Sequence, residues 1–421
     1  MFLKTFRSNP SGWLIVGVVF LTISFSFGAR MSLPVLIPGW EIEFLWSRTF
    51  LTFGAALIMI IMGSVAPFAG HLLDKYGPRY LISGGTILSG ICVLFTSMMG
   101  GNFTLIPPAW LFIGIYCALS ALGYGLVSLP IASATIAQNF EENRGLAISI
   151  GSSGVGGGQL FFIPIMGWMI TALGWRPTLA AFGILIAFVG SVSFFLLKDT
   201  APPVQDGENK SNLTDSIFEK LTKLFKQPIF WLLGGAYFIC GFTTAGVVKV
   251  HFIPYATSCG YTLATGAAAT GVLAGFDMVG MVFSGYLTDK LHRPALLGTV
   301  YFLRALTFIM LFFISDDVAI LFLFAVIFGT LDFATVPPTA GLVASHLGIN
   351  SIGFNMGILF LGHSIGGALG SIFGGWLFDT LMVYDWVWII ALSLALLAAV
   401  LAWSVPEKSE KTPTTTEPLL V

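Results

Sequence analysis

Twelve apolar runs, most of them about 20 residues or longer, constrain this 421-residue chain more than any other feature of its sequence. A helix of about 20 apolar residues crosses the ~30 Å hydrocarbon core of a bilayer. We therefore expect an all-α membrane protein. The runs predict membrane-spanning helices over residues 12–36, 47–72, 80–99, 108–138, 145–172, 177–197, 228–252, 262–288, 294–314, 318–345, 352–379 and 384–404.

The composition agrees with a chain that lies in lipid. Hydrophobic residues make up 56% of the chain and charged residues 9%, whereas soluble domains carry roughly 25% charged residues. A net charge of −1 gives no reason to expect a nucleic-acid partner. The four cysteines lie in or beside apolar runs without paired spacing, which argues against a disulfide framework or a zinc site.

The largest polar gap in the chain divides the predicted helices into six and six. We expect an N-terminal six-helix bundle over 1–197, a cytoplasmic linker over 198–226, a C-terminal six-helix bundle over 227–404 and a disordered cytoplasmic tail over 405–421.

The distribution of basic residues predicts the orientation in the membrane. Fourteen of the 19 Lys and Arg residues fall on the side of the N-terminus, and two, Arg48 and Arg176, fall on the other side. The remaining three, Arg30, Lys249 and Arg304, fall within predicted spans. The positive-inside rule therefore predicts cytoplasmic termini in the cell inner (plasma) membrane. The first apolar run lacks a following cleavage pattern, so we interpret it as helix 1 and not as a signal peptide.

A charged loop motif occurs after span 2 and again after span 8. The first copy is Gly70-His-Leu-Leu-Asp74-Lys75-Tyr-Gly77-Pro78-Arg79, and the second begins Gly285-Tyr-Leu-Thr-Asp289-Lys290. An acid at a helix end can pair with a basic residue or cap a neighbouring helix, and Gly-Pro favours a turn. The motif indicates a conformational latch; an ordinary polar loop is the alternative. The latch residues are Gly70, Asp74, Lys75, Gly77, Arg79, Asp289 and Lys290.

This motif resembles the loop signature of the major facilitator superfamily. The resemblance implies twelve transmembrane helices in two pseudo-symmetric six-helix bundles, with helices 1, 4, 7 and 10 lining a central cavity. It also implies transport by rocking of the two halves about a site near the membrane midplane.

Span 5 resembles the signature of the monocarboxylate porters. The matching residues are Phe140, Arg144, Leu146, Ala147, Gly154 and Gly158. The chain departs from that family at Glu142 and Asn143, and Met281 stands where the family has a substrate-pairing arginine. Related oxalate and formate antiporters place a lysine where this chain has His363. The resemblance implies a small organic anion, such as a monocarboxylate, as substrate.

Ionisable residues inside membrane spans are costly and mark functional sites by default. Arg30, late in helix 1, is the first candidate to bind a substrate carboxylate, because its planar fork suits bidentate contact. The alternative is a structural pair with Glu41 or Glu43. Gln159 follows the glycines of span 5 and is a second candidate, although those glycines favour close helix packing.

Two histidines and two acids complete the predicted site. His251 and His363 are candidates for binding substrate or titrating with a proton, and a buried, hydrogen-bonded histidine is the alternative. Asp277 and Asp332 are candidates for proton coupling, with a charge pair to Arg304 as the alternative. Lys249 in helix 7 would on the simplest interpretation extend toward water.

The sequence therefore predicts a monomeric secondary transporter that carries a small organic anion by proton symport. An efflux pump for amphipathic compounds, driven by proton antiport, is the alternative, since an aromatic-rich chain suits an adaptable apolar cavity. A membrane sensor or membrane-embedded enzyme is disfavoured, because no soluble domain, nucleophile–base pair, metal cluster or cofactor motif stands out. We expect neither enzyme activity nor a cofactor.

Overall fold

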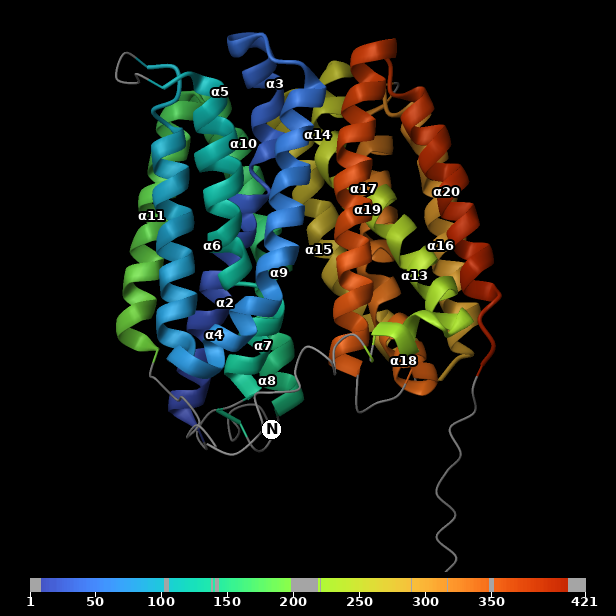
Figure 1. The fold of residues 1–421 in the computed structure, drawn as a ribbon. Coiled ribbons are helices and arrows are strands. Elements are labelled where there is room, and N and C mark those ends of the chain that lie inside the picture. The colour runs from blue at the N-terminus through green and yellow to red at the C-terminus, as the bar shows by residue number, and fades with distance from the viewer. Residues whose placement is uncertain are drawn as a thin grey trace, which may run out of the picture.

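The computed structural model describes residues 9–101, 106–137, 139–140, 144–197, 219, 221–288, 290–315, 317–347 and 352–407. Within these ranges the regular structure is helical (Figure 1). The first half contains α2 (Pro10–Arg30), α3 (Leu33–Phe44), α4 (Arg48–Thr96), α5 (Pro108–Leu111), π-helix η1 (Phe112–Leu119), α6 (Ser120–Leu126), α7 (Leu129–Ala137), α8 (Arg144–Ser152), α9 (Gly154–Gly157), π-helix η2 (Gly158–Phe162), α10 (Ile163–Leu173) and α11 (Trp175–Leu196).

The second half repeats this pattern of long helices. It contains α13 (Pro228–Cys240), π-helix η4 (Gly241–Val248), α14 (Lys249–Ser258), α15 (Leu263–Thr288), α16 (Arg293–Met310), 3-10 helix η5 (Leu311–Phe313), α17 (Val318–Asp332), 3-10 helix η6 (Phe333–Thr335), α18 (Val336–Leu347), α19 (Ile352–Leu381) and α20 (Asp385–Trp403).

The described residues form 12 segments long and apolar enough to cross a membrane, which confirms the predicted number. Helix 1 is longer than predicted and runs over Pro10–Phe44, so that Glu41 and Glu43 belong to α3. Helices 2 and 3 are joined within α4 at Gly77, whose φ of 77° lies in the left-handed region that favours glycine. The predicted turn at Gly77-Pro78 is therefore present.

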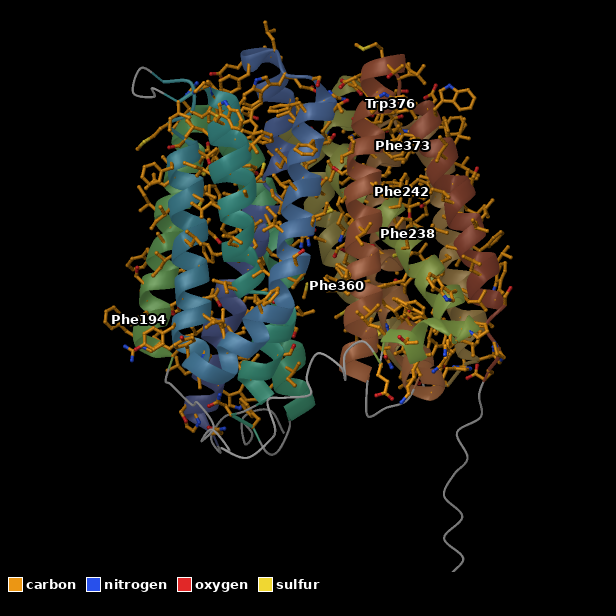
Figure 2. The ribbon with its side chains drawn as sticks, in the orientation of Figure 1. Phe194, Phe238, Phe242, Phe360, Phe373 and Trp376 are labelled. Atoms are coloured by element: carbon orange, nitrogen blue, oxygen red, sulfur yellow. The ribbon has the colours of Figure 1, made fainter. Side chains whose placement is uncertain are left out.

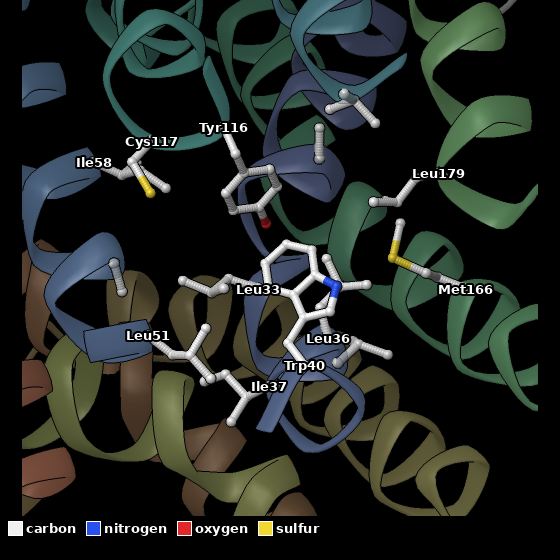
Figure 3. Close-up of a cluster of buried hydrophobic side chains, with 14 of the residues drawn as sticks. Leu33, Leu36, Ile37, Trp40, Leu51, Ile58, Tyr116, Cys117, Met166 and Leu179 are labelled. Carbon is white, nitrogen blue, oxygen red and sulfur yellow. The ribbon is translucent and has the colours of Figure 1, made fainter. Parts of the chain in front are cut away.

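The two halves form two helical bundles that stand side by side (Figure 1). The N-terminal bundle has a core around the fully buried Trp40 (Figure 3). The rings of Phe112, Tyr116 and Trp175 lie edge-on to Trp40, with centroids 5.4–5.6 Å away. Apolar side chains also project from the outward faces of both bundles (Figure 2), as expected for surfaces that contact lipid.

Helices 1, 4, 7 and 10 are all irregular. Helix 1 is interrupted between α2 and α3, and helix 4 between α6 and α7. Helix 7 contains η4, and helix 10 changes to 3-10 geometry in η6 just before Pro337-Pro338. Irregular backbone at membrane depth is tolerated where it is buried in protein or lines a cavity. These breaks therefore identify the inner surface between the bundles.

The bundles contact each other along α3 and α14, α4 and α19, and α10 and α15. Val250, Ile253 and Ala267 of the C-terminal bundle belong to the same buried cluster as Trp40. Arg48, at the start of α4, binds Asp379, near the end of α19. These helix ends lie at the opposite end of the molecule from the start of α2 at Pro10 (Figure 1).

The predicted linker and tail lie largely outside the described residues, so their boundaries stay predictions. Leu224, late in the predicted linker, and Val405, at the start of the predicted tail, are both buried. The carboxylate of Glu407 accepts a hydrogen bond of 2.8 Å from the backbone N–H of Arg293.

Close packing of α15 on α17 depends on a glycine, which gives a test of the fold. A Cβ at Gly280 would lie 1.8 Å from the carbonyl oxygen of Thr330. We predict that Gly280→Ala lowers stability by about 1–3 kcal/mol, because the backbones must separate. Gly84→Ala is the control, since nothing lies within 4 Å of its Cβ. Thermal unfolding of both variants in detergent measures the difference, and equal unfolding temperatures would contradict this packing.

Candidate functional site

Two small adjoining pockets lie where helices 1 and 7 are irregular. Met31, Pro34 and Lys249 line both of them. The first is also lined by Gln159, Val248, Phe252, Ile253, Thr270 and Leu273. The second is also lined by Arg30, Leu33, Ala55, Ile58, Met59, Ala245 and Val250. Both bundles thus contribute to a mostly apolar lining that holds two cationic side chains.

Arg30 is the cation contributed by the N-terminal bundle. It is the last residue of α2, directly before the break in helix 1. Its guanidinium lies 5.0 Å from the ring centroid of Phe27, and within the described part of the chain it forms no ion pair or hydrogen bond with a carboxylate. The alternative pairing with Glu41 or Glu43 is absent, because those acids bind Arg48 and Arg176.

Lys249 is the cation contributed by the C-terminal bundle. It is the first residue after η4, and its ammonium nitrogen lies 2.8 Å from Asp332 Oδ2 and 3.4 Å from Asp277 Oδ2. The ammonium also lies 4.4 Å from the ring centroid of Phe333. Lys249 is therefore paired with two acids of the membrane interior. The simplest interpretation of the sequence, in which Lys249 extends toward water, is wrong.

The exposure of the three charged groups differs. Lys249 is 11% exposed, Asp332 5% and Asp277 1%. Asp277 Oδ1 is buried without a hydrogen-bond partner in the described structure. One ammonium thus faces two buried carboxyl groups, and only the ammonium lines the pockets. Buried charges are costly unless they are paired. The charge state of the two carboxyl groups therefore depends on which cations face them.

Arg304 binds backbone oxygens and not the acidic side chains proposed as its alternative partners. Its guanidinium is fully buried. Nη2 donates to the carbonyl oxygens of Leu331 and Asp332, at 2.6 Å each, and Nη1 donates to Cys240 Sγ at 3.0 Å and Thr244 Oγ1 at 3.1 Å. Arg304 thus satisfies the carbonyl end of α17, where the helix changes geometry.

Two further predicted substrate residues lie in different surroundings. Gln159 is 2% exposed, lines the first pocket, and places its amide nitrogen 3.5 Å from the carbonyl oxygen of Val155. His363 is half-buried on α19, with its ring centroid 4.8 Å from Tyr237 and 5.9 Å from Phe360 (Figure 2). Gln159 therefore joins Lys249 at a pocket, whereas the contacts of His363 are aromatic.

His251 supports a contact between the bundles, because its two partners in the C-terminal bundle, Ser371 and Tyr384, both bond to the N-terminal bundle. It is fully buried, with Nε2 3.0 Å from the carbonyl oxygen of Ser371 and Nδ1 3.1 Å from Tyr384 Oη. Burial raises the pKa of Tyr384, so its hydroxyl stays protonated. These contacts suit a neutral His251 that donates from Nε2 and accepts at Nδ1.

Arg48 extends this contact to the N-terminal bundle. It donates to Glu41 through two bonds of 2.5 Å and to Tyr384 Oη at 2.9 Å. Asp379 accepts from the backbone N–H groups of Arg48 at 3.0 Å and Thr49 at 2.7 Å, which are at the N-terminus of α4. A carboxylate is favourable there because the helix dipole is positive at that end. We name Glu41, Arg48, His251, Asp379 and Tyr384 the inter-bundle clasp.

The predicted conformational latch is only partly visible. Asp289 and the side chains of Asp74 and Lys75 lie outside the described residues, and Gly70 lies within α4. The Arg79 guanidinium lies 4.1 Å from the ring centroid of Phe194 (Figure 2). The Lys290 ammonium donates to the hydroxyl of Tyr286. The role of the latch therefore stays a prediction.

Sequence reasoning missed the clasp and the central position of Lys249. Arg48 carried a signal, because it is one of two basic residues predicted on the outer side. Asp379 and Tyr384 carried none, since a residue at the end of an apolar run does not reveal which helix faces it. In the described part of the chain, no group of three or more His, Cys, Asp or Glu side chains is placed to hold a metal ion.

A twelve-helix, two-bundle fold with charged residues at helix breaks around a central pocket defines a multi-pass membrane transporter. Comparison with known families agrees with this class. The chain belongs to the Major Facilitator Superfamily, whose sequence profile matches residues 18–354 and 282–419.

Individual relatives are distant. Monocarboxylate transporter 13 of Rattus norvegicus is 25% identical, over 90% of this chain and 85% of its own length. The oxalate:formate antiporter of Oxalobacter formigenes is 27% identical, over 65% of this chain and 63% of its own length. The crystal structure of a D-xylose-proton symporter has a TM-score of 0.73 at 18% identity, and the match covers 94% of this chain and 98% of that one. This last similarity shows the fold.

The inter-bundle clasp gives a testable consequence for access to the pocket. Asp379→Ala removes the acceptor at the N-terminus of α4, so we predict that the clasp opens more often. The measurement uses a variant in which the pocket residue Ile253 is replaced by cysteine and Cys259 by serine. A membrane-impermeant maleimide is added on the side of the clasp, and the rate at which it labels the new cysteine reports access to the pocket. We expect labelling to rise several-fold.

The matched control is Asp385→Ala, which removes a nearby acid that is exposed and outside the clasp. Its labelling rate should equal that of the parent cysteine variant. Equal rates for Asp379→Ala and Asp385→Ala would show that the clasp does not limit access.

Proposed function

We propose that this protein is a secondary active transporter of a small organic anion, a monocarboxylate, moved by alternating access together with a proton. The observation that carries the proposal is Arg30. Its guanidinium lines a mostly apolar pocket without a carboxylate partner among the described residues. An unpaired cation inside a membrane protein is costly, and a substrate carboxylate would supply its counter-ion.

The lining of the site favours a small anion with an apolar body. Arg30 and Lys249 line the same pocket from opposite bundles, while Val250, Met59 and Ile58 supply apolar contact. A carboxylate between the two cations would contact both halves, as alternating access requires. Gln159 lines the adjoining pocket and is proposed as a further substrate contact. His251 and His363 are not needed for this arrangement.

Asp277 and Asp332 are the proposed proton carriers. Both are buried and share the single ammonium of Lys249. A change in the charge of the pocket therefore changes the electrostatic environment of both carboxyl groups. The names of two relatives, a monocarboxylate transporter and an oxalate:formate antiporter, support the substrate class. We further propose that the protein is a monomer in the cell inner membrane. The positive-inside rule supports an orientation with the inter-bundle clasp on the outer side and both termini in the cytoplasm.

Uptake into proteoliposomes tests the proposed function. We expect at least one labelled monocarboxylate to be accumulated faster when an inward proton gradient is applied. Uptake that is absent for every acid of a broad panel, with the protein shown to be folded, would overturn the proposal.

The role of Arg30 is tested in the same assay. Arg30→Ala should weaken the apparent affinity for the anion by roughly 10–100-fold, because a charge-assisted hydrogen bond contributes about 1.5–3 kcal/mol. Arg30→Lys should retain part of the affinity. Lys226→Ala, which removes an exposed cation remote from the pocket, is the control. An unchanged affinity in Arg30→Ala would contradict the assignment.

A second candidate function is the efflux of amphipathic compounds by proton antiport. The apolar lining of both pockets favours it. Drug resistance in cells that overproduce the protein, without uptake of any carboxylate, would support efflux over anion symport.

A further inference from the structure

We propose that Lys249 couples the binding of the anion to the binding of the proton, by exchanging its partner Asp332 for the carboxylate of the substrate. This inference rests on the proposed function and specifies how its site works. Lys249 lines both pockets, whereas Asp332 and Asp277 lie behind it and line neither. The ammonium is therefore the part of the ion-paired group that an entering anion meets.

The geometry allows the exchange. An ammonium has three donors; that of Lys249 donates to Asp277 Oδ2 at 3.4 Å and forms an ion pair with Asp332 Oδ2 at 2.8 Å. Arg30 lines the second pocket together with Lys249, so an anion held by Arg30 lies next to the same ammonium. When the anion binds Lys249, Asp332 loses its closest cation.

Among the residues that the structure describes, five charged groups contact this site or share its pocket. Lys249 on α14 faces Asp277 on α15 and Asp332 on α17, and Arg30 on α2 shares its pocket. Arg304 on α16 binds the backbone oxygen of Asp332. With both acids ionised, Lys249 and the two carboxylates sum to −1, and Arg30 and Arg304, neither of which pairs with a carboxylate in the described structure, bring the sum of the five groups to +1.

A monocarboxylate that takes the place of Asp332 on the ammonium leaves that carboxylate without its nearest cation, and a proton on the released carboxyl group removes the unpaired charge. The proton is taken from the aqueous side to which the pocket is open and forms an O–H bond on Asp332. It leaves when the anion departs and Lys249 returns to Asp332. Because an unpaired charge in a membrane interior is costly, anion and proton bind together.

Asp332→Asn is the decisive variant, since it leaves Lys249 paired with Asp277 and leaves no carboxylate unpaired. It removes one of the two carboxylates that compete with the substrate for the ammonium. We expect anion affinity to rise by about tenfold, in line with the loss of a competing ion pair, and proton uptake on binding to disappear. Calorimetry of the purified protein with a transported monocarboxylate, in buffers of different ionisation enthalpy, measures both quantities.

Two further variants separate coupling from a structural role of Lys249. Lys249→Arg keeps the charge and should retain proton uptake of about one per anion. Lys249→Met should bind the anion more weakly, through Arg30 alone, and without proton uptake. If Lys249 only neutralised the buried acids, Asp332→Asn would leave anion affinity unchanged.

The outcomes distinguish this inference from the proposed function. Suppose that the wild-type protein takes up a proton with the anion, and that the Asp332→Asn variant does the same with unchanged anion affinity. This result overturns the proposed role of Lys249 and leaves the proposal of symport intact. A folded wild-type protein that binds no carboxylate overturns both.

Discussion

The pairing of Lys249 with Asp277 and Asp332 is the interaction on which the account of this transporter depends. Charges inside a membrane protein are costly unless they are balanced, and here one ammonium serves two carboxyl groups at 2.8 and 3.4 Å. Arg30 stands apart from them without an acidic partner among the described residues. The charges of the site are thus divided between an ion-paired group and a lone cation, and a bound anion changes the electrostatic balance of both.

The backbone places these charges. Arg30 ends α2, Lys249 follows η4 and Asp332 ends α17, so each lies at an irregularity of a helix that faces the other bundle. Arg304 stabilises one of these irregularities by binding two carbonyl oxygens of α17. The inter-bundle clasp then holds the bundles together at the end opposite Pro10. Rocking of the bundles requires that the clasp separate while the pocket keeps its charges.

The fold could be predicted from the sequence to a large extent, and the site only in part. Length and hydropathy determine a membrane span almost alone, which is why twelve helices were predicted and found. Arg30, Asp277 and Asp332 stood out because charge inside an apolar run is rare. Helix rotation is not encoded in hydropathy, however, so the pairing of Lys249 with both acids and the burial of His251 against Tyr384 needed the structure.

The central claim is that anion and proton enter the site together, so that its net charge does not change. The most direct measurement is the initial rate of uptake of a transported monocarboxylate by proteoliposomes under an imposed potassium diffusion potential, with the pH equal on both sides. The account predicts the same rate at every potential, together with acceleration by a pH gradient alone. A rate that rises or falls with potential at equal pH would show that net charge crosses with the substrate, which contradicts the one-to-one pairing.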